Sequence, residues 1–416
     1  MVVRRILPGY ASLIDTVLIT SLANIIYKIR PGGVFMCKKI CLLLALACVI
    51  LLVPINNTRA ESVPVDTSLV RAAVLMEAET GRLLFGSNEE SKLEVAGLSR
   101  LAALLVICDA FDGGMIDGDT MINVSHKAAS VRGATAFLSE GESMKASDLL
   151  RAAVMINAGD AIHALAATVC GSDSAASERI NNRLSELGIS SRYSDIIGDG
   201  IALSAYDLAL IGRALIKSES FRKYSMCFYE NLTHTTGAKD TELANPNKLV
   251  KQYSGCMGVA TGSSQTAGYC GVFAAERGGT CYIAVSLGAA NSSNRFVCGI
   301  ELMDYGFANF RSVKVVSEGD IIGEVCVSGS LENSVQIAAE SDMVLLVRIN
   351  DSKYYSEAQY EQEITAPISE GQTLGKLVFT DSAGELMGEV NLVSIKEIPN
   401  AGFSDCFDYI LRAWLS

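Results

Sequence analysis

The sequence of 416 residues has few of the side chains that hold metal ions. Its three histidines, His126, His163 and His234, are scattered, and no two cysteines form a CxxC pair. Because zinc sites need such ligands at close and regular spacing, we expect no metal and no cofactor. Glycine-rich phosphate loops are absent too. Lys and Arg form no stripe with interleaved aromatic residues, which argues against nucleic acid as a partner.

Charged residues are scarce and mostly acidic. They make up 19% of the chain against 50% hydrophobic residues, a composition that excludes global disorder. Residues 1–60 hold seven Lys/Arg and one Asp, so the remainder has 34 − 7 = 27 cations, 46 − 1 = 45 anions and a net charge of −18. A body this acidic repels polyanions. The length allows two domains at roughly 100–200 residues each.

The N-terminal region contains the pattern of a secretory signal peptide. Lys38 and Lys39 precede an apolar run from Cys41 to Ile55, and Thr58-Arg59-Ala60 supplies small residues at a cleavage site. We therefore expect residues 36–60 to be a signal peptide cleaved after Ala60, within an N-terminal extension 1–60. Since a signal peptide should be N-terminal, Met36 is the preferred start. The alternative is an uncleaved anchor, for which the run is short of the ~20 residues that span a bilayer.

The cysteines do not form the pattern of a disulfide framework. Three of the twelve lie in the leader, and the nine that remain are an odd number, mostly in apolar runs. Such cysteines are typical of small buried hydrophobic residues. We interpret the body as suited to an envelope that is not strongly oxidising.

Hydrophobic periodicity predicts strands at both ends of the first domain and helices between them. Residues 72–85 form a hairpin with Gly81 at its turn, and residues 268–275 and 281–287 form two further strands. Single helices are expected at 98–112, 207–216 and 294–310, and the apolar, Ala-rich stretch 149–170 is expected to form buried helices. This order predicts an α+β fold in which the first hairpin joins the last strands in one antiparallel sheet.

From Arg311 the pattern changes to short strands separated by Gly and Ser turns. Runs at 313–316, 321–327, 343–349, 376–379 and 389–393 predict a small all-β domain over residues 311–397. The end, residues 398–416, places Phe403, Phe407 and Trp414 on one face of an amphipathic helix. We expect peripheral membrane contact through 403–415; the alternative is an ordinary helix that packs against the domain.

Several motifs, in order and at consistent distances, resemble a known family. They are Leu243-Ala244-Asn245-Pro246-Asn247-Lys248-Leu249, Gly258-Val259-Ala260-Thr261-Gly262, Ala267-Gly268-Tyr269-Cys270, Arg295-Phe296, and Phe137-Leu138-Ser139-Glu140-Gly141. Over residues 65–416 the chain resembles the low-molecular-mass penicillin-binding proteins, which are serine-type D-alanyl-D-alanine carboxypeptidases. The resemblance implies a penicillin-binding, β-lactamase/transpeptidase-like domain over 61–310, with an antiparallel sheet and a helical subdomain.

The family's chemistry needs three elements. A Ser nucleophile begins a helix with a Lys three residues later, so that the Lys amine takes the Ser proton. A Ser-x-Asn loop supplies a second hydroxyl and an amide. A Lys-Thr-Gly strand supplies a cation and donors for the substrate carboxylate. The positions that match these elements form the expected binding cleft: Gly97, Arg100, Asn157, Gly159, Ala260, Thr261 and Gly262.

All three elements lack the groups that carry the chemistry. The nucleophile position is Gly97, and the base position is Arg100, whose guanidinium stays protonated in proteins. Asn157 and Gly159 stand in the Ser-x-Asn loop, and Ala260 replaces the strand lysine. Ser99 lies about 200° around the helix from Gly97, so its hydroxyl should face away. We predict that no catalytic residue is intact.

Other matches are expected by chance. Ser220-Phe221-Arg222-Lys223 has the Ser-x-x-Lys spacing and Ser292-Ser293-Asn294 resembles the second element, but neither lies at the expected junction. His234 beside Thr235-Thr236-Gly237 is interpreted as a histidine of a surface loop. None of these supplies a nucleophile with a base.

Three hypotheses for the function remain. The preferred one is an exported, extracytoplasmic relative of the carboxypeptidases that is catalytically inactive and binds a peptidoglycan stem peptide or an envelope protein. The first alternative is an active D-alanyl-D-alanine carboxypeptidase with a rearranged site. The second is a structural or docking protein at the membrane, in which the β domain and the terminal helix have the main role.

Overall fold

The computed structural model describes residues 65–237 and 239–415. The described residues belong to one compact unit of the chain, residues 63–416. The predicted signal peptide at 36–60 lies outside the described residues.

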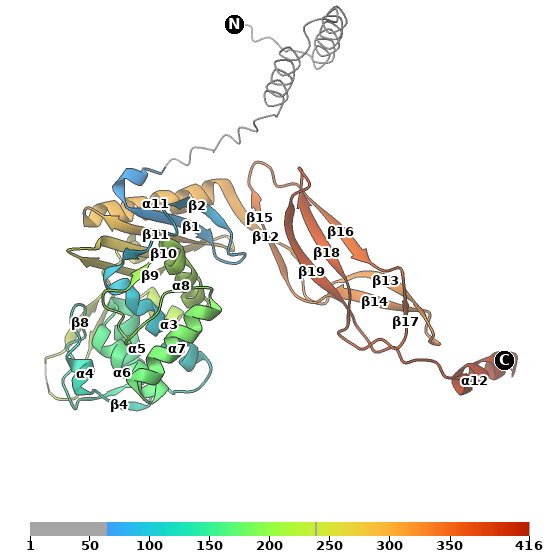
Figure 1. Ribbon diagram of the computed structural model, residues 1–416, viewed down its shortest axis with the longest axis horizontal. Helices are drawn as coiled ribbons and strands as arrows, with labels where there is room; N and C mark the ends of the chain where they lie inside the picture. Colours follow the sequence, from blue (N-terminus) through green and yellow to red (C-terminus); the bar gives the residue numbers. More distant parts are fainter. Residues whose placement is uncertain (1–64, 238, 416) are drawn as a thin grey trace, which may run out of the picture. The chain divides into compact units, whose positions relative to one another are not determined.

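A five-stranded antiparallel sheet forms the centre of the first domain (Figure 1). Its order is β2-β1-β11-β10-β9, so the N-terminal hairpin lies beside the last strands, as the sequence predicts. The strands are β1 (Ala72–Glu77), β2 (Leu83–Ser87), β9 (Cys256–Ser264), β10 (Gly268–Arg277) and β11 (Thr280–Ala289). β9 is an edge strand of this sheet and contains the third motif, residues 260–262.

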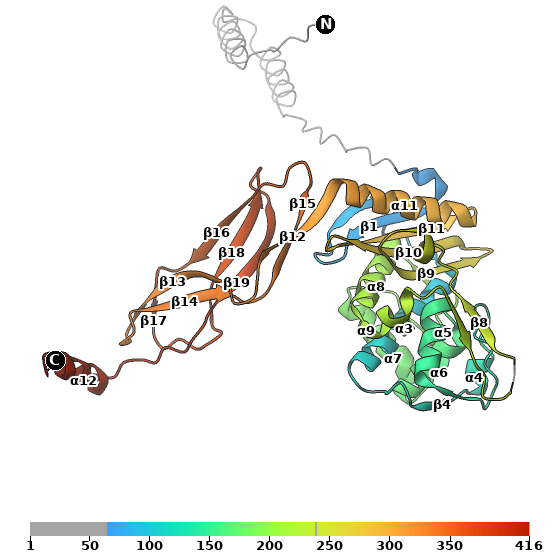
Figure 2. The same cartoon turned by 180° about the vertical axis from the view of Figure 1, so that it is seen from behind.

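Both faces of this sheet are covered, which explains why β1 is apolar throughout. Val74 and Met76 belong to the core beneath the helices, whereas Ala73 and Leu75 belong to the core beneath α11. Figures 1 and 2 show α11 on one face of the sheet and α3, α5 and α8 on the opposite face. Because successive residues of a strand point to opposite faces, a strand covered on both sides is a continuous hydrophobic run.

The helical part contains the elements that carry the first two motifs. The helices are α3 (Leu101–Asp112), α4 (His126–Ala129), α5 (Ala146–Ile156), α6 (Gly159–Cys170), α7 (Asp173–Glu186), α8 (Ala205–Lys217), α9 (Glu219–Ser225), α10 (Leu249–Gln252) and α11 (Ser292–Asn309), with 3₁₀ turns η1 (Thr67–Leu69) and η2 (Ala96–Arg100). The apolar stretch 149–170 is two helices, because Asn157 adopts a left-handed conformation (φ 53°) between them. Short strand pairs complete the domain: β3 (Leu93–Glu94) with β6 (Ala202–Leu203), β4 (Met121–Asn123) with β5 (Ser143–Lys145), and β7 (Tyr229–Leu232) with β8 (Thr241–Ala244).

The second domain is all β and begins directly after α11, at Phe310. β12 (Phe310–Val316) pairs with β15 (Met343–Arg348), and a six-stranded sheet has the order β16-β18-β19-β14-β13-β17. The latter strands are β13 (Ile321–Ser328), β14 (Ser334–Ala339), β16 (Tyr354–Tyr360), β17 (Glu363–Thr365), β18 (Thr373–Asp381) and β19 (Leu386–Ser394). Alternate residues such as Val325, Ile337 and Leu392 form its own buried core. α12 (Phe403–Leu415) follows.

Within the described part of the chain, no helix combines the length and apolar character needed to cross a bilayer. The same residues contain no group of three or more His, Cys, Asp or Glu side chains placed to hold a metal ion.

Candidate functional site

The nucleophile position lies in η2, the short turn that leads into α3. Gly97 has no side chain, and its carbonyl accepts a hydrogen bond from Asn157 Nδ2 at 2.7 Å. A Cβ added at Gly97 would meet only Asn157 Nδ2, at 3.6 Å, which is ordinary van der Waals contact. Position 97 therefore has no reactive side chain but has space for a larger residue.

Arg100, at the base position, is a buried structural residue. Its Nη1 donates to the carbonyls of Ala134 (2.9 Å) and Asn157 (3.2 Å), and its Nη2 donates to the carbonyl of Arg132 (2.5 Å). Only 4% of the residue is exposed. Burial lowers the pKa of Arg100 from its ordinary value, while the charges of Asp199 and Asp160 oppose that shift. An arginine held in this way joins η2 to two loops and accepts no proton from a neighbour.

Gly159 is required by the size of Arg100. A Cβ at this position would lie 2.7 Å from Arg100 Cζ and 2.6 Å from Val131 Cγ1, distances that real contacts do not reach. Arg100 and Gly159 therefore fit each other: the guanidinium takes the space beside the first turn of α6. The amide that the second motif normally carries has no room while Arg100 is present.

The loop before α6 is fixed by its own polar side chains. Asn157 is 5% exposed, and its Oδ1 is buried without a hydrogen-bond partner. Asp160 accepts hydrogen bonds from the backbone N–H groups of Ala136, Leu138 and Ala161, at 2.9 to 3.1 Å. Its carboxylate thus satisfies donors at a helix N-terminus, where negative charge is favourable. These contacts hold the neighbouring loop in place.

The third motif lies on the edge strand β9, next to η2. Ala260, Thr261 and Gly262 pair with Val272, Gly271 and Cys270 of β10, and the first two are nearly buried. A Cβ at Gly262 would lie 3.2 Å from the backbone N of Gly97, so the first and third motifs meet here. The structure thus brings all seven predicted positions into one region.

Arg295, from α11, places a cation beside this strand. Its Nη1 donates to the carbonyls of Gly262 (3.0 Å) and Cys270 (3.4 Å), and its guanidinium lies 5.5 Å from the ring centre of Tyr269. In the described residues it has no carboxylate partner within ion-pair distance. Burial lowers its pKa from the ordinary value. Arg295-Phe296 belongs to the family resemblance, but Arg295 lies in α11, outside the three motifs from which the cleft was predicted.

Ser99 has a structural environment. Its hydroxyl donates to the carbonyl of Ile197 at 2.9 Å, and the residue is 1% exposed. The side chain therefore faces the interior, and its hydrogen-bond partners among the described residues are backbone carbonyls.

The interpretation of His234 as a surface-loop residue is wrong. It is 6% exposed, with Nδ1 2.9 Å from Glu142 Oε1 and Nε2 2.9 Å from Thr241 Oγ1. Glu142 Oε1 also accepts the N–H of Thr235. No sequence pattern indicates this burial, because Glu142 lies 92 residues earlier. His234 links the loop before β5 to the hairpin β7–β8.

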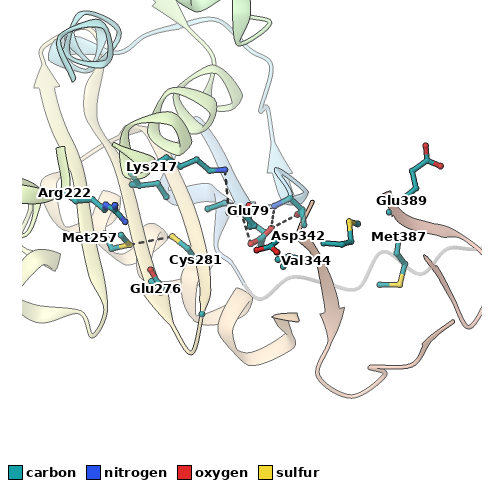
Figure 3. Close-up of a pocket in the computed structure, with 17 residues that line it drawn as sticks. Glu79, Lys217, Arg222, Met257, Glu276, Cys281, Asp342, Val344, Met387 and Glu389 are labelled. Carbon is teal, nitrogen blue, oxygen red and sulfur yellow. Dashed lines mark hydrogen bonds and ion pairs between the residues drawn. The ribbon is translucent and has the colours of Figure 1, made fainter. Parts of the chain in front are cut away.

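A cavity lies away from the motif positions. It has a volume of about 850 Å³ and is lined by residues of the turn after β1, the end of α8, and strands β15 and β19. Figure 3 shows Lys217 extending towards Glu79, and Met257 beside Cys281 with 3.9 Å between their sulfur atoms. Glu77 in its wall is fully buried and accepts from Thr80 and from Ser312 Oγ. Lys217 and Glu79 form an ion pair here, and the hydrogen bonds of Glu77 join the turn after β1 to the β domain.

Comparison with known proteins identifies related sequences over most of the chain. The family model for D-alanyl-D-alanine carboxypeptidase matches residues 58–291, and the model for the C-terminal domain of penicillin-binding protein 5 matches residues 310–400. D-alanyl-D-alanine carboxypeptidase DacF of Bacillus subtilis is 29% identical over 352 residues, 83% of this chain and 90% of that protein. DacD of Escherichia coli is 27% identical over 322 residues, 74% of this chain and 81% of that protein.

Solved structures share the fold. Penicillin binding protein 5 from Haemophilus influenzae has a TM-score of 0.71 at 24% identity and covers 80% of this chain and 98% of its own. Penicillin binding protein 6B from Escherichia coli has a TM-score of 0.61 at 23% identity, covering 78% and 95%. The predicted fold class, an α+β penicillin-binding domain followed by a small all-β domain, is confirmed.

Proposed function

Since the chain belongs to the D-alanyl-D-alanine carboxypeptidase family, we propose that it is an inactive member of that family. In this proposal it is exported to the cell envelope and binds peptidoglycan stem peptide without forming an acyl-enzyme. Its localisation is inferred from relatives named for an enzyme activity on D-alanyl-D-alanine ends. The proposal has two parts, the loss of acyl transfer and the retained binding of peptide, and each part has its own test.

One observation carries the loss of catalysis. Arg100 donates to three backbone carbonyls at the position of the base, and Gly97 has no side chain at the position of the nucleophile. Acyl transfer by this mechanism needs a hydroxyl within hydrogen-bond reach of a group that takes its proton. Removing the nucleophile or the base alone costs on the order of 10⁶ in rate in a serine hydrolase.

Retained recognition is supported by the edge of the central sheet. β9 has a partner on one side only among the described strands, and an extended peptide binds such an edge through main-chain hydrogen bonds. Thr261 lies in this strand and the Arg295 guanidinium lies beside Gly262. A cation there favours a peptide that ends in a carboxylate, although Ala260 supplies none. Because Arg100 fills the space beside Gly159, we expect this binding to be shallow and weak.

Labelling with a fluorescent penicillin tests the catalytic half. We expect no stable acyl adduct with the full chain and no release of D-alanine from a pentapeptide ending in D-Ala-D-Ala. The Ser99→Ala variant is the matched control for a rearranged site. An adduct on the full chain that disappears in Ser99→Ala would establish the active alternative and overturn the proposal.

Calorimetry with that pentapeptide and with its C-terminal amide tests the recognition half. We expect weak binding that prefers the free carboxylate, and a smaller preference in Thr261→Val, which keeps the side-chain shape. Equal affinity for acid and amide contradicts the role given to Arg295. Absence of binding to both peptides rejects peptide recognition and leaves the loss of catalysis standing.

Docking at a membrane is a second candidate, favoured by α12. Phe403 and Trp414 are 88% and 89% exposed, and Phe407, Ile410 and Leu411 are exposed as well. An amphipathic helix with a bare apolar face binds at the boundary between lipid headgroups and acyl chains. We expect Phe403→Ser/Trp414→Ser to reduce sedimentation of the full chain with neutral phosphatidylcholine vesicles. Unchanged sedimentation would reject this role for α12.

A further inference from the structure

A second surface of the first domain combines lysines with exposed apolar side chains, where α9, β7 and α10 come together. We define the basic–aromatic surface by six residues: Lys223, Met226, Phe228, Tyr229, Lys248 and Lys251. The three lysines are exposed, and Met226, Phe228 and Tyr229 are 56%, 37% and 52% exposed. Figure 2 shows α9 and β8, the partner of β7, on the helical side of the sheet.

Two segments that are separate in the sequence form this surface. Asn245 Nδ2 donates to the carbonyl of Cys227 at 3.1 Å, and the backbone N–H of Asn245 donates to the carbonyl of Phe228 at 2.9 Å. Asn247 Oδ1 accepts the N–H of Leu249, which begins α10. The Asn-x-Asn motif that supported the family resemblance therefore fixes Lys248 and the following α10, which contains Lys251, against the segment that carries Phe228.

The lysines of this surface are not neutralised by carboxylates. Lys251 Nζ lies 5.3 Å from the ring centre of Phe228, and Lys223 Nζ lies 5.3 Å from that of Tyr224. Residues 223–229 and 245–253 contain no Asp or Glu, in a chain of net charge −12. Across residues 65–237 and 239–415, none of the ion pairs found involves Lys223, Lys248 or Lys251.

The centre of the surface is hollow. A cavity of about 450 Å³ is lined by Phe228, Lys248, Lys251 and Gln252. Its walls therefore offer two ammonium groups, an amide and an aromatic ring. An anionic group with an apolar part fits this combination, because the ammonium groups bind the charge and the ring contacts the apolar part.

We propose that the basic–aromatic surface docks the protein on an anionic lipid bilayer. Lysines attract acidic headgroups, and exposed aromatic or apolar side chains enter the interfacial layer beside them. A soluble polyanion would use the lysines alone and would leave Met226, Phe228 and Tyr229 without a role. The inference is independent of the proposed loss of catalysis and of peptide binding.

Vesicle partitioning of the full chain tests this docking. The two lipid compositions are phosphatidylcholine alone and phosphatidylcholine with about one third phosphatidylglycerol. We expect stronger binding to the anionic vesicles, weakened when salt rises from about 0.1 M to 1 M. Lys248→Gln/Lys251→Gln should lower the partition coefficient for anionic vesicles by about 30-fold, at about 5-fold for each lysine. Phe228→Ser should lower it by about 5-fold.

The matched control is Lys314→Gln/Lys376→Gln, which changes the net charge equally. These lysines pair with Asp342 and Glu389, at 2.8 and 2.9 Å, and lie in the β domain. We expect this control to bind anionic vesicles within about 2-fold of the parent. All variants retain α12. Any charge-independent binding through α12 is therefore the same in every variant and is measured with the neutral vesicles.

Three outcomes would overturn the proposal. The first is equal partition of the parent into neutral and anionic vesicles. The second is a Lys248→Gln/Lys251→Gln variant that melts like the parent and binds anionic vesicles equally well. The third is binding of soluble polyphosphate, lost in that variant, without preference for anionic vesicles, which would assign the surface to a polymer.

Discussion

At the scale of single residues, Arg100 and Gly159 are the pair that defines the site. Sequence comparison identifies both as departures from the family pattern, because the neighbouring residues still match. It does not explain why they occur together. Only the structure places the guanidinium where a Cβ of residue 159 would be, 2.7 Å from Arg100 Cζ. Contacts between side chains 59 positions apart in the sequence are not visible in periodicity or composition.

Gly159→Ala tests this fit. We expect it to lower the free energy of unfolding by about 2 kcal/mol, because an added methyl group overfills a packed site. The Arg100→Ala background is already destabilised by about 3 kcal/mol, because three carbonyls lose their donors. There the added methyl should cost about 1 kcal/mol less than in the parent, since only the contact with Val131 Cγ1 remains. Urea denaturation of the four proteins of the cycle measures the coupling. Additive effects would show that the two positions do not share one space.

At the scale of elements, periodicity predicted the first hairpin, β10, β11 and most of the long helices, but it missed β14, β16 and α7. The hairpin 72–85, α8 and α11 lie where the apolar pattern placed them, because each buries a regular face. The stretch 149–170 divides at Asn157, a break that depends on a left-handed backbone and not on hydrophobicity. The buried pair of His234 and Glu142 was missed for a similar reason: two polar residues far apart in the sequence resemble loop residues until the fold joins them.

His234→Ala tests how much this link between elements contributes. It removes the partner of Glu142 Oε1 and of Thr241 Oγ1, both 2.9 Å away, and leaves a buried carboxylate with fewer donors. We expect the free energy of unfolding to fall by about 3 kcal/mol. His126→Ala is the control, since that histidine pairs with Glu140 at the surface, and it should cost at most about 0.5 kcal/mol. Equal losses in the two variants would contradict the distinction.

At the scale of the whole molecule, a few polar contacts join the β domain to the central sheet. Ser312 Oγ donates to Glu77 at 3.0 Å, Ser312 N donates to Thr280 Oγ1 at 2.8 Å, and Tyr282 OH donates to the carbonyl of Phe310 at 3.0 Å. The sequence indicated the change of character near Arg311. It did not indicate that β12 begins immediately after α11 and contacts the turn after β1.

Glu77→Ala should loosen this junction. The variant removes an acceptor shared by Thr80 and Ser312, and we expect tryptic cleavage at Arg311 and Lys314 to become at least about 10-fold faster. Mass spectrometry of the fragments gives the sites. Glu389→Ala, which removes an exposed carboxylate of the same cavity, is the control and should leave the cleavage rate unchanged. Cleavage elsewhere in the chain would argue against a role for Glu77 at the junction.

Buried thiols make the stability of the whole molecule sensitive to alkali. Burial raises the pKa of Cys256 from 9.0 to about 11, and the pKa of Cys298 from 9.0 to about 12. Below pH 9 both the folded and the unfolded thiols are neutral, so this contribution to stability is complete there. Above pH 9 the unfolded thiols lose protons first, and the stability falls until the folded pKa is reached.

We therefore expect the melting temperature to drop between pH 9 and pH 11, with a smaller drop in Cys256→Ala/Cys298→Ala. Scanning calorimetry under reducing conditions measures the melting temperatures of the parent and of the double variant. The double variant should be less stable than the parent at pH 7, and the difference should narrow as the pH rises. An identical drop in both proteins would show that other groups cause it.

The reciprocal fit of Arg100 and Gly159 also limits the order in which the two residues can be substituted. While the arginine is in place, an amide at position 159 collides with it, so the second motif cannot be rebuilt first. Position 97 is different, because its nearest neighbour is 3.6 Å away and a serine enters without conflict. Any series of substitutions towards the family's motifs must therefore shorten Arg100 and displace Val131 before it enlarges residue 159.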